Sequence, residues 1–387
     1  MTVLNLTTAA SLELVPILVN STNHSMMNVC DFYVIMNYPE IEIPVLLFCG
    51  TSIGLAGVAI NCFLLYVLIQ LRQQRLASVT YLTVLAALDI WTAVSYILVF
   101  SVQALYSYID SYSIYRIWWH YFRELLCMGQ MSQLSSSYMI VGATVDRYCE
   151  ISHKKTVLCT YRGRCGIILG TLTLCILVRI SSCFEFDLHY DSTCQGYSSH
   201  QFFPSNLGRA AEYIQIQVHV FSFLETILPF FTLLIINIAI VNRLHSEERA
   251  RMKQSRVRHT YLSIRRGLTQ EISIVDALKK RRQARDATRL TVAMATIYLL
   301  SHSLNFIITM MKQFNIDVLL RYAILHILAV HIGNLLLLAS STMRIAVYYF
   351  TNADIRHMIQ WTLKCHRSAK KKISEEAMFM DSELPLL

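Results

Sequence analysis

The sequence predicts an all-α membrane protein, built as a bundle of seven transmembrane helices. Composition is the first reason: of 387 residues, 55% are hydrophobic and only 15% are charged, whereas a soluble protein carries about 25% charged residues. The second reason is that the apolar residues stand in long blocks, and about 20 such residues span the hydrocarbon core as a helix. The blocks lack the apolar–polar alternation of a membrane barrel, so helices remain as the spanning structure.

Seven blocks are long enough to cross a bilayer once. The first carries no charged residue, the third is the most polar, and the fourth is the shortest, with Arg179 near its end. At a rise of about 1.5 Å per residue, even the shortest block matches a core about 30 Å thick. The predicted spans are 43–71, 77–106, 120–150, 165–184, 213–243, 287–312 and 319–349.

The segment 1–42 is predicted to be a glycosylated arm outside the cell. It holds all three N-x-S/T sequons of the chain, at Asn5, Asn20 and Asn23, and such acceptors are glycosylated in the lumen. It lacks the basic start and the small-residue cleavage site of a signal peptide. Seven crossings of the 43–350 bundle then put the long loop 244–286 and the tail 351–387 in the cytoplasm.

The distribution of charge supports this topology and a location in the plasma membrane. The formal net charge is +9, no Lys or Arg precedes Arg72, and fourteen lie between Arg243 and Arg289. This is the positive-inside pattern of membrane proteins, and it excludes nucleic acid as the reason for the basic charge. The outer segments carry eleven acids against six bases, an excess that attracts a cationic ligand, although exposed loops can also be acidic simply because they are solvated.

Polar landmarks inside the spans point to a family. Asn61 lies in the first helix, Asp89 in the second and Pro229 in the fifth, while Asp146-Arg147-Tyr148 ends the third. In this order and spacing, residues 43–365 resemble rhodopsin-like G-protein-coupled receptors. The resemblance implies a receptor and not an enzyme, with no cofactor or metal, and with a heterotrimeric G protein and arrestin as partners. Its coupling residues would be Asp146, Arg147, Tyr148 and Tyr348, with Arg147 paired to Asp146 at rest.

The seventh helix and its continuation are more specific. Asn334-Leu-Leu leads into Ser340-Ser341-Thr342-Met343-Arg344 and on to Tyr348, a run similar to that of invertebrate FMRFamide-type neuropeptide receptors. That family begins a short amphipathic eighth helix where this chain has Ile355-Arg356, which would turn Ile355, Met358, Ile359 and Trp361 toward lipid. Cys365 at its end is either a palmitoylation site or a spare cytosolic cysteine.

The chain departs from the family in helices 4, 6 and 7. The tryptophan of the fourth helix is missing, and Tyr298-Leu-Leu-Ser301-His302-Ser303-Leu304 stands where the family has Phe-x-x-Cys-Trp-x-Pro. Because proline removes a backbone hydrogen bond and bends a helix, its loss predicts a straighter sixth helix. Outward movement of that helix is the family's activation step, so the change bears directly on signalling.

Arg344 stands where the family has asparagine, opposite Asp89 across a small sodium site. A buried arginine in lipid surroundings needs a partner. We therefore hypothesise that Arg344 pairs with Asp89 and takes the place of the sodium ion. The alternative is that Arg344 extends to the inner membrane interface. The polar residues expected around this site are Asn61, Asp89, Ser136, Ser340 and Arg344.

The cysteines of this chain do not stand where the family's usual disulfide would require them. The usual cysteine of the third helix corresponds to Phe122, and Cys127 lies five residues later. The outside cysteines are Cys30, Cys127, Cys183 and Cys194, and four cysteines allow three complete pairings. We expect Cys194 to be oxidised, with Cys127 or Cys30 as its partner.

The outer halves of the helices suggest a peptide ligand. Gly129 stands where receptors for amine transmitters carry an aspartate, which argues against an amine. Glu225 would contact either a ligand cation or another helix. Amides, one acid and many aromatic residues suit a cationic peptide with an amidated end. The residues expected in this pocket are Gln103, Gln130, Gln133, Glu225, His302, Asn305 and Asn334.

The sequence thus predicts a neuropeptide receptor that acts through a heterotrimeric G protein. The alternative is a seven-helix receptor that no longer signals and acts as a ligand sink or a scaffold for heteromers, because its sixth- and seventh-helix switches are altered.

Overall fold

The protein is described here from a computed structural model. The residues that the structure describes are 43–73, 79–152, 160–194, 196–261, 270–314, 321–353, 355–362 and 364. Asn5, Asn20, Asn23 and Cys30 of the arm, and Cys365 of the tail, lie outside the described residues.

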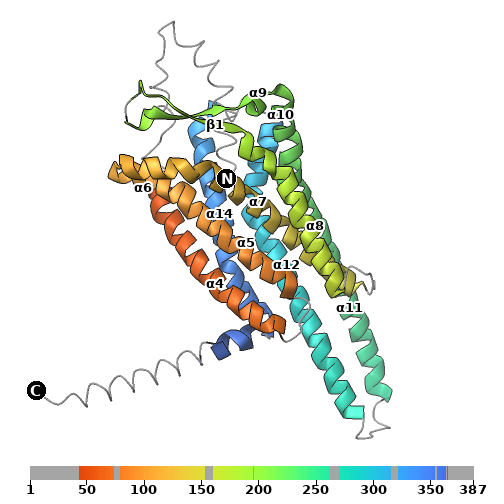
Figure 1. The fold of residues 1–387 in the computed structure, drawn as a ribbon. Coiled ribbons are helices and arrows are strands. Elements are labelled where there is room, and N and C mark those ends of the chain that lie inside the picture. Colours follow the sequence, from red (N-terminus) through yellow and green to blue (C-terminus); the bar gives the residue numbers. More distant parts are fainter. Residues whose placement is uncertain are drawn as a thin grey trace, which may run out of the picture.

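Seven long helical segments lie side by side as one bundle (Figure 1). The first joins a π-helical turn, Ile43–Gly50, to α4 (Thr51–Gln73), and the second joins α5 (Thr80–Tyr96), a π-helical turn Ile97–Ser101 and α6 (Val102–Ile109). The remaining long helices are α7 (Tyr112–Ile151), α8 (Tyr161–Arg179), α11 (Leu228–Tyr261), α12 (Gln270–Phe314) and α14 (Ala323–Thr351).

A β-hairpin lies over one end of the bundle (Figure 1). It pairs β1 (Phe186–Tyr190) with β2 (His200–Pro204) in antiparallel register, with Phe186 opposite Pro204. Two short helices follow, α9 (Asn206–Arg209) and α10 (Ala211–Gln215), and the Ser205 hydroxyl caps α9 by accepting a hydrogen bond from the Gly208 amide at 3.2 Å. We call this the hairpin end of the bundle, and the other the opposite end.

The protein is a multi-pass membrane protein. Six of its described helical segments are long and apolar enough to cross a bilayer, and α7 is not among them. This helix contacts α5, α6, α8, α11 and α12, so protein rather than lipid covers much of its surface. Its polar residues Ser132, Ser135, Ser136 and Ser137 are all buried. The low hydropathy of the third predicted span therefore reflects its central position in the bundle.

Aromatic residues fill the core at the hairpin end. The rings of Trp118 and Phe122 of α7 pack at a tilt of 40° with centroids 4.3 Å apart, and the Trp118 indole donates a hydrogen bond to the Val99 carbonyl at 2.9 Å. Tyr115 is completely buried, and its hydroxyl donates to the Tyr197 carbonyl at 2.8 Å. Buried aromatic rings provide large contact areas, while their polar atoms need a partner. This cluster therefore joins α5 and α7 to the hairpin segment.

The absence of proline leaves α12 as one unbroken α-helix over Gln270–Phe314. The hydroxyls of Ser301 and Ser303 donate to carbonyls of the same helix, at 2.9 Å to Ile297 and 2.7 Å to Leu300. The segment before Pro229 differs, since it contains two π-helical turns, Ile216–Phe221 and Phe223–Ile227. Proline clashes with the carbonyl four residues earlier, here that of Glu225, which accounts for the widened second turn.

Two features at the opposite end of the bundle differ from the sequence prediction. The helices α11 and α12 extend far into the predicted loop 244–286 and project beyond the other helices at the opposite end (Figure 1). Arg, Lys, Glu and Ala are good helix formers, so the basic segment continues both helices.

The helix predicted after the bundle is present at 355–362, but its residues Ile355 and Ile359 are buried in the bundle core. The expectation that both face lipid is wrong, because they cover the end of that core.

The disulfide also differs from the first of the two pairings we expected. Cys127 of α7 is bonded to Cys183 in the short turn after α8, with Cα atoms 5.3 Å apart. A Cys127–Cys194 bond is therefore excluded, because the deeper position of Cys127 brings it to the end of α8 and not to the hairpin loop. Cys194 is disulfide-bonded as well, and none of the other cysteines that the structure describes is its partner.

We predict that Cys127→Ser and Cys183→Ser each lower the free energy of unfolding by about 2–4 kcal/mol, because each removes the same cross-link from the unfolded chain. Thermal unfolding of the purified full chain would measure the loss, and the double variant should resemble either single one. Cys62→Ser is the control, since Cys62 is a free, exposed cysteine. A double variant much less stable than the singles would contradict the pairing.

Candidate functional site

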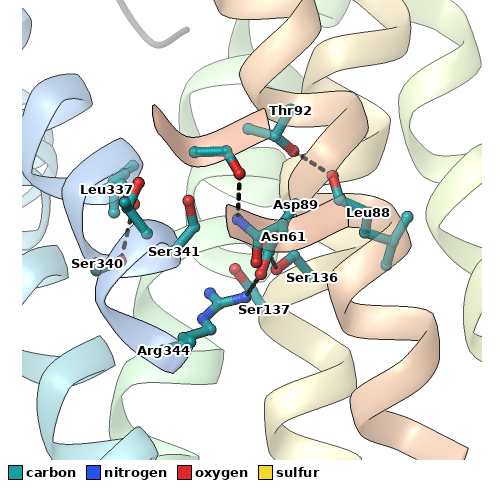
Figure 2. Close-up of polar contacts among 12 residues, drawn as sticks. Asn61, Leu88, Asp89, Thr92, Ser136, Ser137, Leu337, Ser340, Ser341 and Arg344 are labelled. Carbon is teal, nitrogen blue, oxygen red and sulfur yellow. Dashed lines mark hydrogen bonds and ion pairs between the residues drawn. The ribbon is translucent and has the colours of Figure 1, made fainter. Parts of the chain in front are cut away.

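The centre of the bundle contains a buried ion pair. The Arg344 guanidinium of α14 donates to a carboxylate oxygen of Asp89 on α5, and the Ser136 hydroxyl of α7 donates to the other oxygen at 3.4 Å (Figure 2). The side chains of Arg344 and Asp89 are only 10% and 3% exposed. Three helices that are distant in sequence thus meet at one carboxylate.

The other predicted members of this site make local contacts. The Asn61 amide donates to the Gly57 carbonyl at 2.9 Å, and the Ser340 hydroxyl donates to the Leu337 carbonyl at 2.8 Å (Figure 2). Both side chains are buried. These bonds satisfy groups that would be costly to bury alone, but they stay within one helix.

A small polar cavity lies next to the ion pair. Its volume is about 50 Å³, enough for water molecules but not for a peptide. Its lining includes three residues expected in the ligand pocket, Gln133, His302 and Asn334, together with Asp89 and Arg344. The cavity therefore brings three residues of the predicted pocket next to the Asp89–Arg344 ion pair.

Three further residues expected in the pocket, Gln103, Gln130 and Asn305, are not among those that line this cavity. Gln130 is buried on α7, one turn from Gln133, and its carbonyl oxygen has no hydrogen-bond partner. Asn305 is buried on α12 and lies close to Gly333, where an added Cβ would meet its amide oxygen at 2.1 Å. Gln103 on α6 is half-buried.

Glu225 is paired with another helix, which was the alternative to a ligand contact. The Arg179 guanidinium at the end of α8 donates to the Glu225 carboxylate. Arg179 also contacts the Ser182 hydroxyl at 3.4 Å and the Gln217 side-chain oxygen at 3.5 Å, and it lies over the Phe221 ring. The charge of Glu225 is therefore already neutralised inside the protein.

Glu185 extends this network beyond the end of the span. Its carboxylate accepts a hydrogen bond from the Gln217 amide at 2.8 Å. Burial raises the pKa of Glu185 from 4.5 to about 7, although the Arg179 charge and the Gln217 hydrogen bond lower it in part. Glu185 thus changes charge near neutral pH.

The predicted coupling residues lie near the opposite end of α7. Tyr348 of α14 is buried in the core there, and Tyr148 is half-buried. The expected Asp146–Arg147 pair is absent from this structure. The Arg164 side chain donates to Asp146 at 3.0 Å, and Arg147 donates to Glu150 at 2.5 Å. Neighbouring residues on a helix point about 100° apart, so Asp146 faces α8 while Arg147 lies along its own helix.

Sequence reasoning missed Arg164, Arg179 and His331. The two arginines stand at the ends of the fourth span, where an arginine either extends to the membrane interface or pairs with an acid, and hydropathy does not choose between these. His331 lies one turn from Asn334, is 3% exposed, and neither ring nitrogen has a hydrogen-bond partner. Its position on the Asn334 face of α14 was the available signal, because residues three apart on a helix share a face.

These observations describe a helical membrane bundle with a buried polar centre, in which a disulfide joins the third helix to the turn that follows the fourth. The chain is a distant homologue of the FMRFamide receptor of Drosophila melanogaster, with 29% identity over 217 residues. The match covers 54% of this chain and 39% of the relative, so the chain matches well under half of that receptor's length. No family model matches the chain. The homology is to a receptor and not to an enzyme, as the sequence predicted.

We predict that Asp89→Asn or Arg344→Asn alone lowers stability by about 3–5 kcal/mol, because each leaves a buried charge without its partner. The double variant Asp89→Asn/Arg344→Asn should recover most of this loss, since it contains no buried charge. Thermal unfolding of the purified chain would measure all three variants. The pair would be disproved if Asp89→Asn were equally harmful with and without the second substitution.

We predict that thermal stability falls as pH rises from about 5 to above 7, with Glu185 as one source of the change. The folded protein binds the Glu185 proton more tightly than the unfolded chain, because its pKa is about 7 rather than 4.5. This contribution to stability is therefore complete at acid pH and is lost as pH passes 7. The difference in melting temperature between wild type and Glu185→Gln across this range measures the effect, and a constant difference would contradict it.

Proposed function

We propose that the protein is a neuropeptide receptor that relays binding of its ligand to a heterotrimeric G protein. The observation that carries the proposal is the position of Arg147 at one end of a bundle whose centre contains a cavity lined by polar side chains, among them the amides of Gln133 and Asn334. Distant homology to a peptide receptor supports the same class.

In this proposal the hairpin end faces the outside of the plasma membrane. The arm 1–42 would be glycosylated there, at Asn5, Asn20 and Asn23, and the bundle 43–350 would place Arg147 and the basic ends of α11 and α12 in the cytoplasm. The tail 351–387 would carry the membrane-parallel helix and Cys365 as its lipidation site. The positive-inside distribution of charge supports this orientation.

The ligand is proposed to be a cationic, amidated peptide whose amidated end enters the bundle. Asp89 and Glu225 are both already paired with arginines, so neither offers a free charge to a ligand cation. An uncharged carboxamide fits the amides of Gln130, Gln133 and Asn334 and the unpartnered nitrogens of His331, because it both donates and accepts hydrogen bonds. The cationic part would remain at the hairpin end, where Asp187 is exposed and Asp191 is half-buried.

Because Asp89 is already paired with Arg344, we also expect ligand binding to be independent of sodium. The Arg344 guanidinium already supplies a positive charge to Asp89, and a second cation beside it would be repelled.

The test is nucleotide exchange in membranes of cells that express the full chain. A panel of amidated neuropeptides is applied with each class of heterotrimeric G protein. We expect at least one peptide to stimulate exchange on the wild type, and Arg147→Ala to abolish stimulation while binding of that peptide persists. Peptide binding without exchange in any combination would instead favour the second function, a ligand sink or scaffold, which the unbroken α12 makes the main competitor.

A further inference from the structure

Near the opposite end of the bundle, two acids of α7, Asp146 and Glu150, form ion pairs with arginines, and the two pairs differ in their exposure to solvent. The Asp146–Arg164 pair is buried, with side-chain exposures of 5% and 7%. The Arg147 side chain is also only 10% exposed, but its partner Glu150 is 50% exposed. Charges attract more strongly in a dry interior than beside water. Asp146 is therefore the more firmly engaged of the two acids.

Arg164 has a position that makes Asp146 its natural partner. It lies in the first turn of α8, whose start is capped by the Thr160 hydroxyl, which accepts a hydrogen bond from the Gly163 amide at 3.1 Å. The start of a helix carries partial positive charge and is unfavourable for a cation. A buried arginine there needs an acid from a neighbouring helix, and Asp146 supplies it.

The engagement of Asp146 has a consequence for Arg147. An acid that is bonded to Arg164 is not available to the arginine beside it, so within the described residues Glu150 is the acid that contacts Arg147. Glu150 lies three residues further along the same helix, where side chains are neighbours. Its half-exposed carboxylate makes a weak ion pair that a partner protein can displace at small cost.

We propose that Glu150, and not Asp146, restrains Arg147 in the resting receptor, and that Arg164 is the positioning residue that enforces this choice by occupying Asp146. The effect on signalling rests on the proposed function, because it is through Arg147 that the G protein would be engaged. The pairing itself does not depend on that function.

A double-mutant cycle on the purified full chain tests the pairing without any G protein. Asp146→Asn and Arg164→Gln should each lower the melting temperature, and the double variant should lose less than the sum of the two shifts. The same cycle on Asp146→Asn and Arg147→Gln should be additive. Coupling of Asp146 to Arg147 that equals or exceeds its coupling to Arg164 would overturn the proposal.

Ligand-independent nucleotide exchange, normalised to the amount of receptor at the cell surface, tests the restraint. We expect Glu150→Gln to raise this exchange about two- to fivefold, the range of a weak, half-exposed ion pair. Glu124→Gln is the matched control, since Glu124 is on the same helix, is 53% exposed and is paired with Arg123. It should leave exchange unchanged.

Arg164→Gln provides the second arm. Asp146 then loses its partner and becomes free to bind Arg147, so exchange should fall below that of the wild type. In the double variant Glu150→Gln/Arg164→Gln, Asp146 takes over the restraint and the rise should disappear, whereas Arg164→Lys should behave like the wild type. A rise that persists in the double variant, or no rise in Glu150→Gln, would overturn the proposal. Absence of exchange in every receptor would count against the proposed function, while the melting cycle still decides the pairing.

Discussion

The need to pair buried charges governs the arrangement of this bundle. In the part of the chain that the structure describes, three ion pairs join different helical segments: Asp89–Arg344, Asp146–Arg164 and Glu225–Arg179. They join α5 to α14, α7 to α8, and α8 to the segment that leads into α11. A charge left alone in hydrocarbon costs several kcal/mol, so each pair fixes which helices are neighbours and how they are rotated. The apolar residues place the helices in the membrane, and the charges align them.

Stiffness is distributed unevenly along the bundle. At the hairpin end, the aromatic cluster around Tyr115 and the Cys127–Cys183 bond join α5, α7 and α8 to the segment that contains the hairpin. Interlocked rings and a covalent bond leave little freedom there. At the opposite end, Arg147 has a half-exposed partner. In the proposed receptor, this gradient would leave the contacts of Arg147 easier to change than those at the hairpin end.

The departures from the related receptors are mutually consistent. Arg344 brings a fixed positive charge into the centre, where it pairs with Asp89. The sixth helix has lost its proline, and Ser301 and Ser303 bond to their own helix, so α12 contains no widened turn. Movement of α12 would depend on contacts between helices and not on a bend within it.

The sequence by itself determined the number and order of the helices, because hydropathy over 20 residues is a local property of the chain. It also led to the hypothesis of an Asp89–Arg344 pair, but it left open the extension of Arg344 to the membrane interface, and the structure decided for the pair. Tertiary structure decided the other partners. Asp146 has Arg147 beside it in sequence but Arg164 beside it in space, and Cys127 reaches Cys183 rather than Cys194. Rotation of one helix against the next selects among such neighbours, and no local pattern of residues encodes that rotation.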